Sequence, residues 1–125
     1  MTENTTKPMI LVDMAKNRIR IHRTALDALQ NPEYILLVIN PKEKTIGILP
    51  SELSDPGAHR VKTPSVMIKK SYEIYSAGFT RELREVCKEW LPTGKYLMEG
   101  LLMPGKQVVC FSMREAEFKG TGKVS

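Results

Sequence analysis

The chain of 125 residues has only two cysteines and two histidines. Cys87 and Cys110 belong to no Cys-x-x-Cys pair and have no second cluster to complete a zinc site, so we interpret both as reduced core thiols. His22 and His59 have no carboxylate or serine at a spacing typical of catalysis, and the sequence contains no Walker, Gly-x-Ser-x-Gly or dinucleotide-binding motif. We therefore expect no enzyme activity, no catalytic residue, no metal ligand and no cofactor.

The sequence also lacks an apolar run of the roughly 20 residues that a membrane-spanning helix needs. The stretch Met1 to Lys7 is polar and has no apolar segment after a basic start, unlike a secretory signal. These absences predict a cytoplasmic protein without a membrane partner.

Composition predicts one ordered domain at residues 9–114. The polar residues 1–8 predict a disordered N-terminus, and residues 115–125, which end in a segment rich in lysine and glycine, predict a flexible tail.

A strand, a short helix and a hairpin are predicted in the first half. Charged and apolar residues alternate from Arg18, which indicates a half-buried strand, and Thr24 is expected to cap the helix that follows. Two apolar runs, 35–39 and 45–49, flank a turn segment and predict a hairpin. The first run contains no polar residue, so we expect a strand that is covered on both faces, either by the other half of the chain or by a second copy in a homodimer.

The same order is predicted in the second half. A strand at 66–75 precedes a helix whose apolar stripe runs from Phe79 to Trp90, and strands at 96–103 and 107–113 follow. Arg81, Arg84 and Lys88 alternate on that helix with Glu82, Glu85 and Glu89, which predicts mutual pairing on a solvent-facing surface.

The expected fold class is therefore α+β, with two strand-helix-hairpin units packed as one domain. The units span residues 12–50 and 66–113, and residues 51–65 join them. Two such units would cover each other's hairpins in a barrel-like arrangement around a pseudo-twofold axis, although a homodimer would explain the apolar run equally well.

A basic segment is the sharpest chemical feature of the sequence. No acidic residue occurs between Asp13 and Asp27, whereas the same interval holds Lys16, Arg18, Arg20, His22 and Arg23. The net charge is +5, and Met1 to Lys70 supplies most of it, with 11 basic and 7 acidic residues. A strand that presents arginines on one side can follow a phosphate backbone. The alternative is a solvated edge strand whose charges discourage pairing with another sheet.

The segment Lys16-Asn17-Arg18-Ile19-Arg20-Ile21, with the short helix and hairpin after it, resembles swapped-hairpin DNA-binding proteins of the AbrB and MraZ type. The resemblance covers Val12 to Pro50. It implies that Lys16, Arg18 and Arg20 reach phosphates or base edges, and that two such units in one chain are arranged as in the MraZ branch. The second unit has Lys70-Ser71-Tyr72-Glu73 and no arginine there, so only the first would read DNA.

The stretch Ile21 to Pro50 is more closely similar to uncharacterised bacterial and phage proteins in which a short helix and a strand ending in Ile-Gly-Ile-x-Pro recur. This likeness implies a bacterial or phage-borne protein and no particular activity.

The sequence is compatible with two functions. The first is binding of double-stranded DNA by a dimeric or pseudo-dimeric protein through Lys16, Arg18, Arg20, His22 and Arg23. The second is a protein-interaction or self-association module that binds no nucleic acid.

Overall fold

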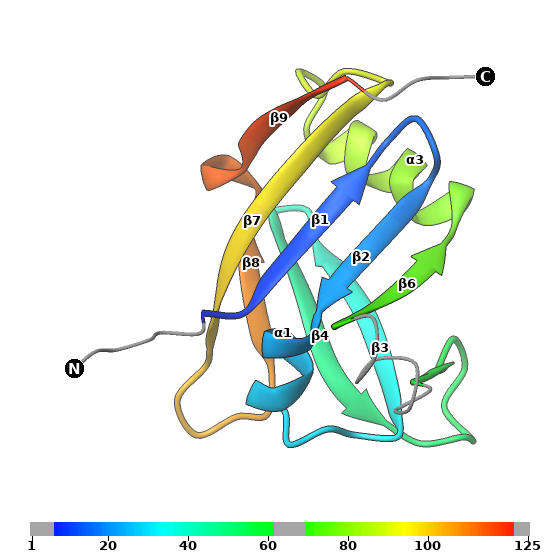
Figure 1. The fold of residues 1–125 in the computed structure, drawn as a ribbon, viewed down its shortest axis with the longest axis vertical. Helices are drawn as coiled ribbons and strands as arrows, with labels where there is room; N and C mark the ends of the chain where they lie inside the picture. The colour runs from blue at the N-terminus through cyan, green and yellow to red at the C-terminus, as the bar shows by residue number, and fades with distance from the viewer. Residues whose placement is uncertain (1–6, 62–69, 122–125) are drawn as a thin grey trace.

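The structure is a computed structural model that describes residues 7–61 and 70–121. Strands dominate it (Figure 1). The elements in chain order are β1 (Met9–Asp13), β2 (Arg18–His22), α1 (Arg23–Ala28), β3 (Tyr34–Asn40), β4 (Thr45–Ser51), β5 (His59–Arg60), β6 (Ser71–Tyr75), α3 (Ala77–Val86), β7 (Gly94–Leu102), β8 (Val109–Ser112), the 3-10 turn η1 (Met113–Glu115) and β9 (Glu117–Thr121).

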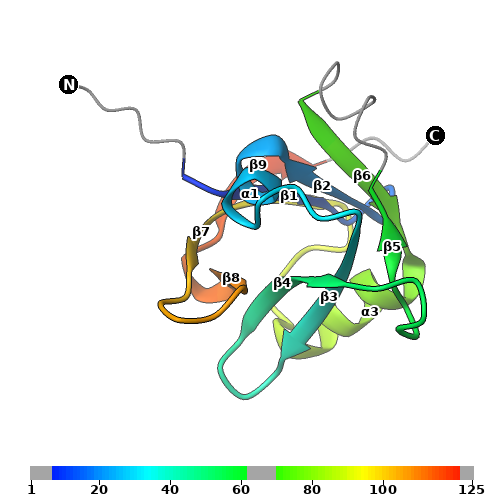
Figure 2. The same ribbon diagram turned by 90° about the horizontal axis from the view of Figure 1, so that it is seen from below.

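All strand pairs are antiparallel, and the strands follow the order β5-β3-β4-β8-β7-β1-β2-β6 with β9 added beside β7. The sheet curls into a half-barrel, which Figure 2 shows from below. β7 connects the two parts of the curled sheet. One of its edges pairs with β1, and the other pairs first with β9 and then with β8.

The expected α+β class is wrong, because the molecule is mostly antiparallel sheet and the described residues contain two α-helices. The predicted strand-helix-hairpin units do not stand as separate bodies. β2 pairs with β6 and β4 pairs with β8, so strands from the two halves alternate within one sheet. Local periodicity identified most strands but could not show which strand each one pairs with.

The core lies inside the half-barrel and is built by alternation along the strands. The side chains that are at most 1% exposed include Ile10, Val12, Ile19, Ile21, Ile46, Ile48, Met98, Val109 and Phe111. Leu26 of α1 and Leu83 of α3 close the core from the helices. Each such side chain contributes on the order of 1.5–3 kcal/mol relative to an exposed one. In the described part of the chain, no helix has the length and apolar character that crossing a membrane requires.

Several local predictions differ from the structure. The cap of α1 is His22 and not Thr24, because the Nδ1 atom of His22 accepts a hydrogen bond from the Thr24 N–H at 3.2 Å. The second helix ends at Val86, and Trp90 lies beyond it, stacked on Tyr96 with the ring centroids 4.2 Å apart.

The expected flexible tail also differs from the structure, and the other half of the chain does not supply the expected cover of the hairpin. Glu117–Thr121 within the tail forms β9 and pairs with β7. Within one chain the apolar run of β3 is covered on one face only, since Ile35 is buried but Val38 is 45% exposed, and cover by a second copy stays a prediction. Residues 66–69 of the strand predicted at 66–75 lie outside the described residues.

A substitution at Gly100 tests how closely β7 packs against β8. A Cβ atom at Gly100 would lie 2.6 Å from Cε2 of Phe111 and 2.9 Å from the backbone oxygen of Cys110. We expect Gly100→Ala to lower the free energy of unfolding by about 1–3 kcal/mol, measured by urea denaturation.

Gly78→Ala in α3 is the matched control, because no atom lies within 4 Å of a Cβ at Gly78. This substitution should raise stability by up to about 1 kcal/mol. Equal effects of the two substitutions would contradict the packing of β7 on β8.

Candidate nucleic-acid interface

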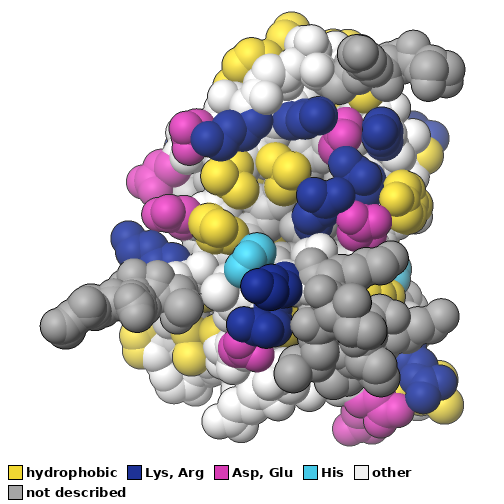
Figure 3. Space-filling model, viewed as in Figure 1, with side chains coloured by type: hydrophobic (Ala, Val, Ile, Leu, Met, Phe, Trp, Pro, Cys, Tyr) yellow, Lys and Arg dark blue, Asp and Glu magenta, His cyan; other side chains and the backbone are white. Residues whose placement is uncertain are grey.

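The structure places the five predicted residues on or next to the outward side of β2. Arg18, Arg20 and His22 point outward, alternating with fully buried isoleucines, as predicted. Lys16 lies in the turn between β1 and β2, and Arg23 begins α1. We call Lys16, Arg18, Arg20, His22 and Arg23 the basic face; Figure 3 shows lysine, arginine and histidine side chains gathered on this side of the molecule.

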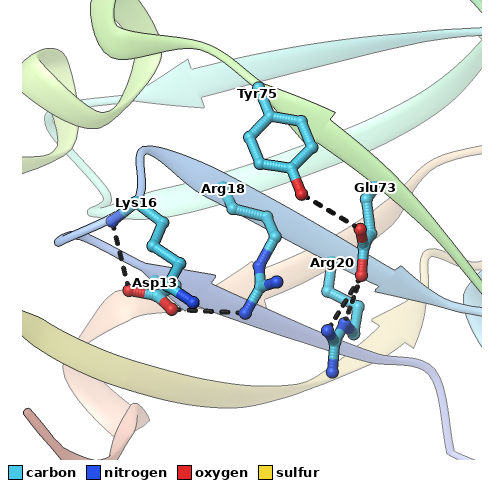
Figure 4. A network of polar contacts seen from close by, with 6 residues as sticks. All are labelled: Asp13, Lys16, Arg18, Arg20, Glu73 and Tyr75. Atoms are coloured by element: carbon cyan, nitrogen blue, oxygen red, sulfur yellow. Dashed lines mark hydrogen bonds and ion pairs between the residues drawn. The ribbon is translucent and has the colours of Figure 1, made fainter. Parts of the chain in front are cut away.

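Arg20 is paired with Glu73, which stands directly opposite it on β6. The Nε and Nη2 atoms of Arg20 lie 2.9 and 2.8 Å from Oε2 of Glu73. The hydroxyl of Tyr75 donates to the other carboxylate oxygen at 3.3 Å (Figure 4). The Arg20 side chain is still 40% exposed, so the pair is open to solvent.

Arg18 is held more deeply by Asp13 of β1. Nη2 of Arg18 lies 3.3 Å from Oδ2 of Asp13, and the Lys16 backbone N–H donates to Oδ1 at 3.3 Å (Figure 4). The carboxyl side chain is 1% exposed and the arginine side chain 16% exposed. Because Arg18 compensates a buried carboxylate, it has a structural role whether or not DNA is bound.

The remaining cations are less constrained. Nε of Arg23 lies 3.7 Å from Oδ2 of Asp27, and both side chains are exposed to solvent in large part. The backbone N–H of Arg23 donates to the carbonyl of Lys70, which brings an exposed lysine next to the basic face. The ammonium group of Lys16 forms no ion pair with any residue that the structure describes.

The interval without acidic residues is therefore compensated in three dimensions. Asp13 and Asp27, which bound the interval, each pair with a cation inside it, and Glu73 reaches it from 53 residues away in the sequence. The sequence could not reveal the last pair because it depends on the register of β2 on β6.

The charges around Glu73 control its titration. Burial acts to raise the pKa of Glu73, but the hydrogen bond and charge of Arg20, the charge of Arg18 and the Tyr75 hydroxyl together hold the pKa below its ordinary value of 4.5. The carboxylate is thus ionised at neutral pH and keeps Arg20 in place.

An apolar strip lies beside the basic face and was not predicted. Met9 and Leu11 of β1 and Leu97 of β7 line a shallow hollow of about 180 Å³, and Arg20 and His22 form its border. The signal in the sequence was the apolar start of β1, whose neighbours could not be assigned before the sheet order was known. The hollow can accept an apolar group next to a cationic edge.

No group of three or more metal-ligating side chains occurs within residues 7–61 and 70–121. Burial raises the pKa of the Cys87 thiol, with the charge of Glu89 acting in the same direction, so the thiol is protonated at neutral pH.

The role of Arg18 leads to a stability prediction. Arg18→Ala would leave the Asp13 carboxylate buried without its partner, and we expect a loss of about 3 kcal/mol in the free energy of unfolding. Lys16→Ala removes an exposed lysine from the same turn and should change stability by less than about 0.5 kcal/mol. Urea denaturation of both variants measures the difference, and equal losses would contradict a structural Arg18.

The Glu73 pair leads to a pH prediction. A depressed pKa in the folded state stabilises the protein above the ordinary pKa of 4.5, and this contribution disappears as pH falls through the folded-state value. We expect Glu73→Gln to be less stable than the parent at pH 7, by up to about 1 kcal/mol for a partly exposed pair. The difference should shrink as the pH falls through the lowered folded-state pKa of Glu73 and vanish below it; a difference that persists in acid would show that it arises from packing instead.

Comparison of the chain with protein-family models, with curated proteins and with solved structures finds no match. The resemblance to AbrB- and MraZ-type proteins therefore stays a prediction.

Proposed function

We propose that this protein binds double-stranded DNA through the basic face. The observation that carries the proposal is that Lys16, Arg20, His22 and Arg23 gather at one solvent-accessible side of β2, although they belong to a turn, a strand and a helix. Outward side chains two residues apart on a strand are separated by about 6.8 Å, so Arg20 and His22 can contact separate phosphates.

Arg20 supports the proposal despite its ion pair. A guanidinium group has five N–H donors, and the nitrogen atoms Nε and Nη2 of Arg20 engage Glu73 through one carboxylate oxygen. Its other donors can reach a phosphate while Glu73 fixes the plane of the group. Arg18 is assigned a positioning role in this proposal, because its side chain is mostly buried against Asp13.

The apolar hollow fits the same partner. Met9, Leu11 and Leu97 lie next to Arg20 and His22, so a sugar or the methyl group of thymine can pack there while the cations contact the backbone. Binding would be mainly electrostatic and weakly selective, because few side chains of this surface offer a fixed pattern of donors and acceptors to base edges.

We place this binding protein in the cytoplasm of a bacterium or of a phage-infected cell, and assign it no catalysis and no cofactor. Cys87 and Cys110 are both free, which suits a reducing compartment.

Two substitutions, one at each member of the Arg20–Glu73 ion pair, should change the affinity for DNA in opposite directions and so test the proposal. Arg20→Gln leaves Glu73 uncompensated and should weaken binding of a labelled duplex several-fold, lowering the slope of log K against log salt by about one unit. Glu73→Gln releases Arg20 from a competing anion and should strengthen binding. Fluorescence anisotropy at low and moderate salt measures both.

Circular dichroism and denaturation establish that each variant is folded, and the Arg20→Gln/Glu73→Gln double variant keeps the net charge of the parent. If both single variants bound the duplex more weakly, or both more tightly, the pair would have a structural role and not a role in binding. Absence of duplex binding by the parent at low salt would overturn the proposal.

Self-association is the second candidate function, and a row of residues on the outward side of the other half of the sheet favours it. Val38, Gly47, Cys110 and Leu101 stand directly opposite one another across β3, β4, β8 and β7. Val38 is 45% exposed and Leu101 69% exposed.

The neighbouring row contains the uncharged residues Asn40, Thr45 and Ser112. In a protein of net charge +5, these uncharged positions on β3, β4 and β8 let a second copy approach with little repulsion, so the occupant proposed for this face is another copy of the chain.

Leu101→Arg should reduce the mass measured by light scattering from that of a dimer to that of a monomer at micromolar concentration. A parent protein that is monomeric at the same concentration would exclude this candidate. DNA binding by the Leu101→Arg variant would then report whether the two functions depend on each other.

A further inference from the structure

A polar hollow separate from the basic face lies between the β1–β2 turn and α3. Its volume is about 210 Å³, and Asn17, Thr80, Arg81 and Arg84 contribute its polar lining. The turn and the helix are adjacent in Figure 1, and the backbone N–H of Ser76 donates to the carbonyl of Asn17 at 2.8 Å. The two sides of the hollow are thus attached to each other.

The side chain of Asn17 is oriented by the hydroxyl of Thr80, whose single proton also has the carbonyls of Ser76 and Ala77 within reach at 3.3 and 3.2 Å. The Oδ1 atom of Asn17 accepts a hydrogen bond of 2.7 Å from the hydroxyl of Thr80, a side chain that is 3% exposed. With Oδ1 engaged in this way, the amide nitrogen keeps two N–H donors that have no acceptor among the residues the structure describes. An amide held by its oxygen presents these donors without a large loss of side-chain entropy on binding.

Arg81 and Arg84 supply positive charge on the other side. They are exposed and lie three residues apart on α3, so their side chains project from one face of the helix. The sequence predicted that they would pair with Glu82, Glu85 and Glu89. Within the described chain neither arginine forms an ion pair, so both guanidinium groups remain available.

Two backbone N–H groups at the start of α3 are already engaged within the helix. The Ser76 hydroxyl accepts from the Phe79 N–H at 3.1 Å, and the Thr80 N–H donates to the Ser76 carbonyl at 3.2 Å. The charge of the hollow therefore comes from the arginines, and hydrogen-bond donors come from Asn17 and the guanidinium groups.

We infer that this hollow binds one phosphate group between Arg81, Arg84 and the amide of Asn17. Guanidinium groups form paired hydrogen bonds to phosphate oxygens, and an asparagine amide adds a neutral donor. The identity of the ligand as a phosphate of the DNA backbone rests on the proposed function. In that case DNA would contact the basic face and pass the β1–β2 turn, where Lys16 lies, to place a further phosphate beside α3.

Inorganic phosphate tests the hollow without DNA. Sodium phosphate should raise the Tm of the parent above its value in sodium chloride at equal ionic strength, and this difference should be lost in Arg81→Ala/Arg84→Ala. Lys88→Ala/Lys106→Ala is the control, because it removes the same charge from two exposed positions that do not line the hollow and should retain the difference. An equal response to phosphate in all three proteins would overturn the inference.

Duplex binding then identifies the source of the phosphate. The Arg81→Ala/Arg84→Ala variant should reduce the salt slope by about one unit, whereas the Lys88→Ala/Lys106→Ala control should not. A phosphate response without any duplex binding by the parent would reject the proposed function and assign the hollow to a free phosphate compound. Equal loss of slope in both double variants would show a general charge effect and overturn the assignment to DNA phosphate.

Discussion

The pairing of β7 on both of its edges is the constraint on which the rest of the molecule depends. β7 has nine residues and pairs with β1 through Lys95–Glu99, while its other edge serves β9 and then β8. Gly100 lies where the partner changes, and the Phe111 ring packs against the space that a side chain would occupy there. This single strand joins the part of the sheet that carries the basic face to the part that carries the row of Val38, Gly47, Cys110 and Leu101.

Ion pairs determine the side-chain positions and the electrostatic potential of the basic face. Glu73 and Asp13 hold Arg20 and Arg18 at defined positions, so the exposed Arg20 loses less conformational freedom on binding than a free lysine would. The same carboxylates reduce the positive potential at the surface. The affinity of a partner for the basic face would therefore depend on the fixed positions of the arginines as much as on net charge. In this respect the basic face differs from a cluster of unpaired lysines.

The sequence predicted individual strands better than their assembly. Alternation located β2 with its buried isoleucines, and the two apolar runs located the hairpin β3–β4. It did not reveal that β1 enters between β7 and β2, because strand order depends on contacts between residues far apart in the sequence. For the same reason the basic residues were identified correctly as outward-facing, but the partner Glu73 was missed.

The sheet order has a consequence for how the chain becomes folded during synthesis. β1, β2 and β4 in the first half pair respectively with β7, β6 and β8 in the second half. A ribosome-bound nascent chain that lacks residues 94–112 therefore has no partner for one edge of β1 or of β4, and its apolar strands remain open. The complete sheet can therefore close only after residues 94–112 have left the ribosome, and until then the outward charges of β2 oppose association of this part of the chain with others.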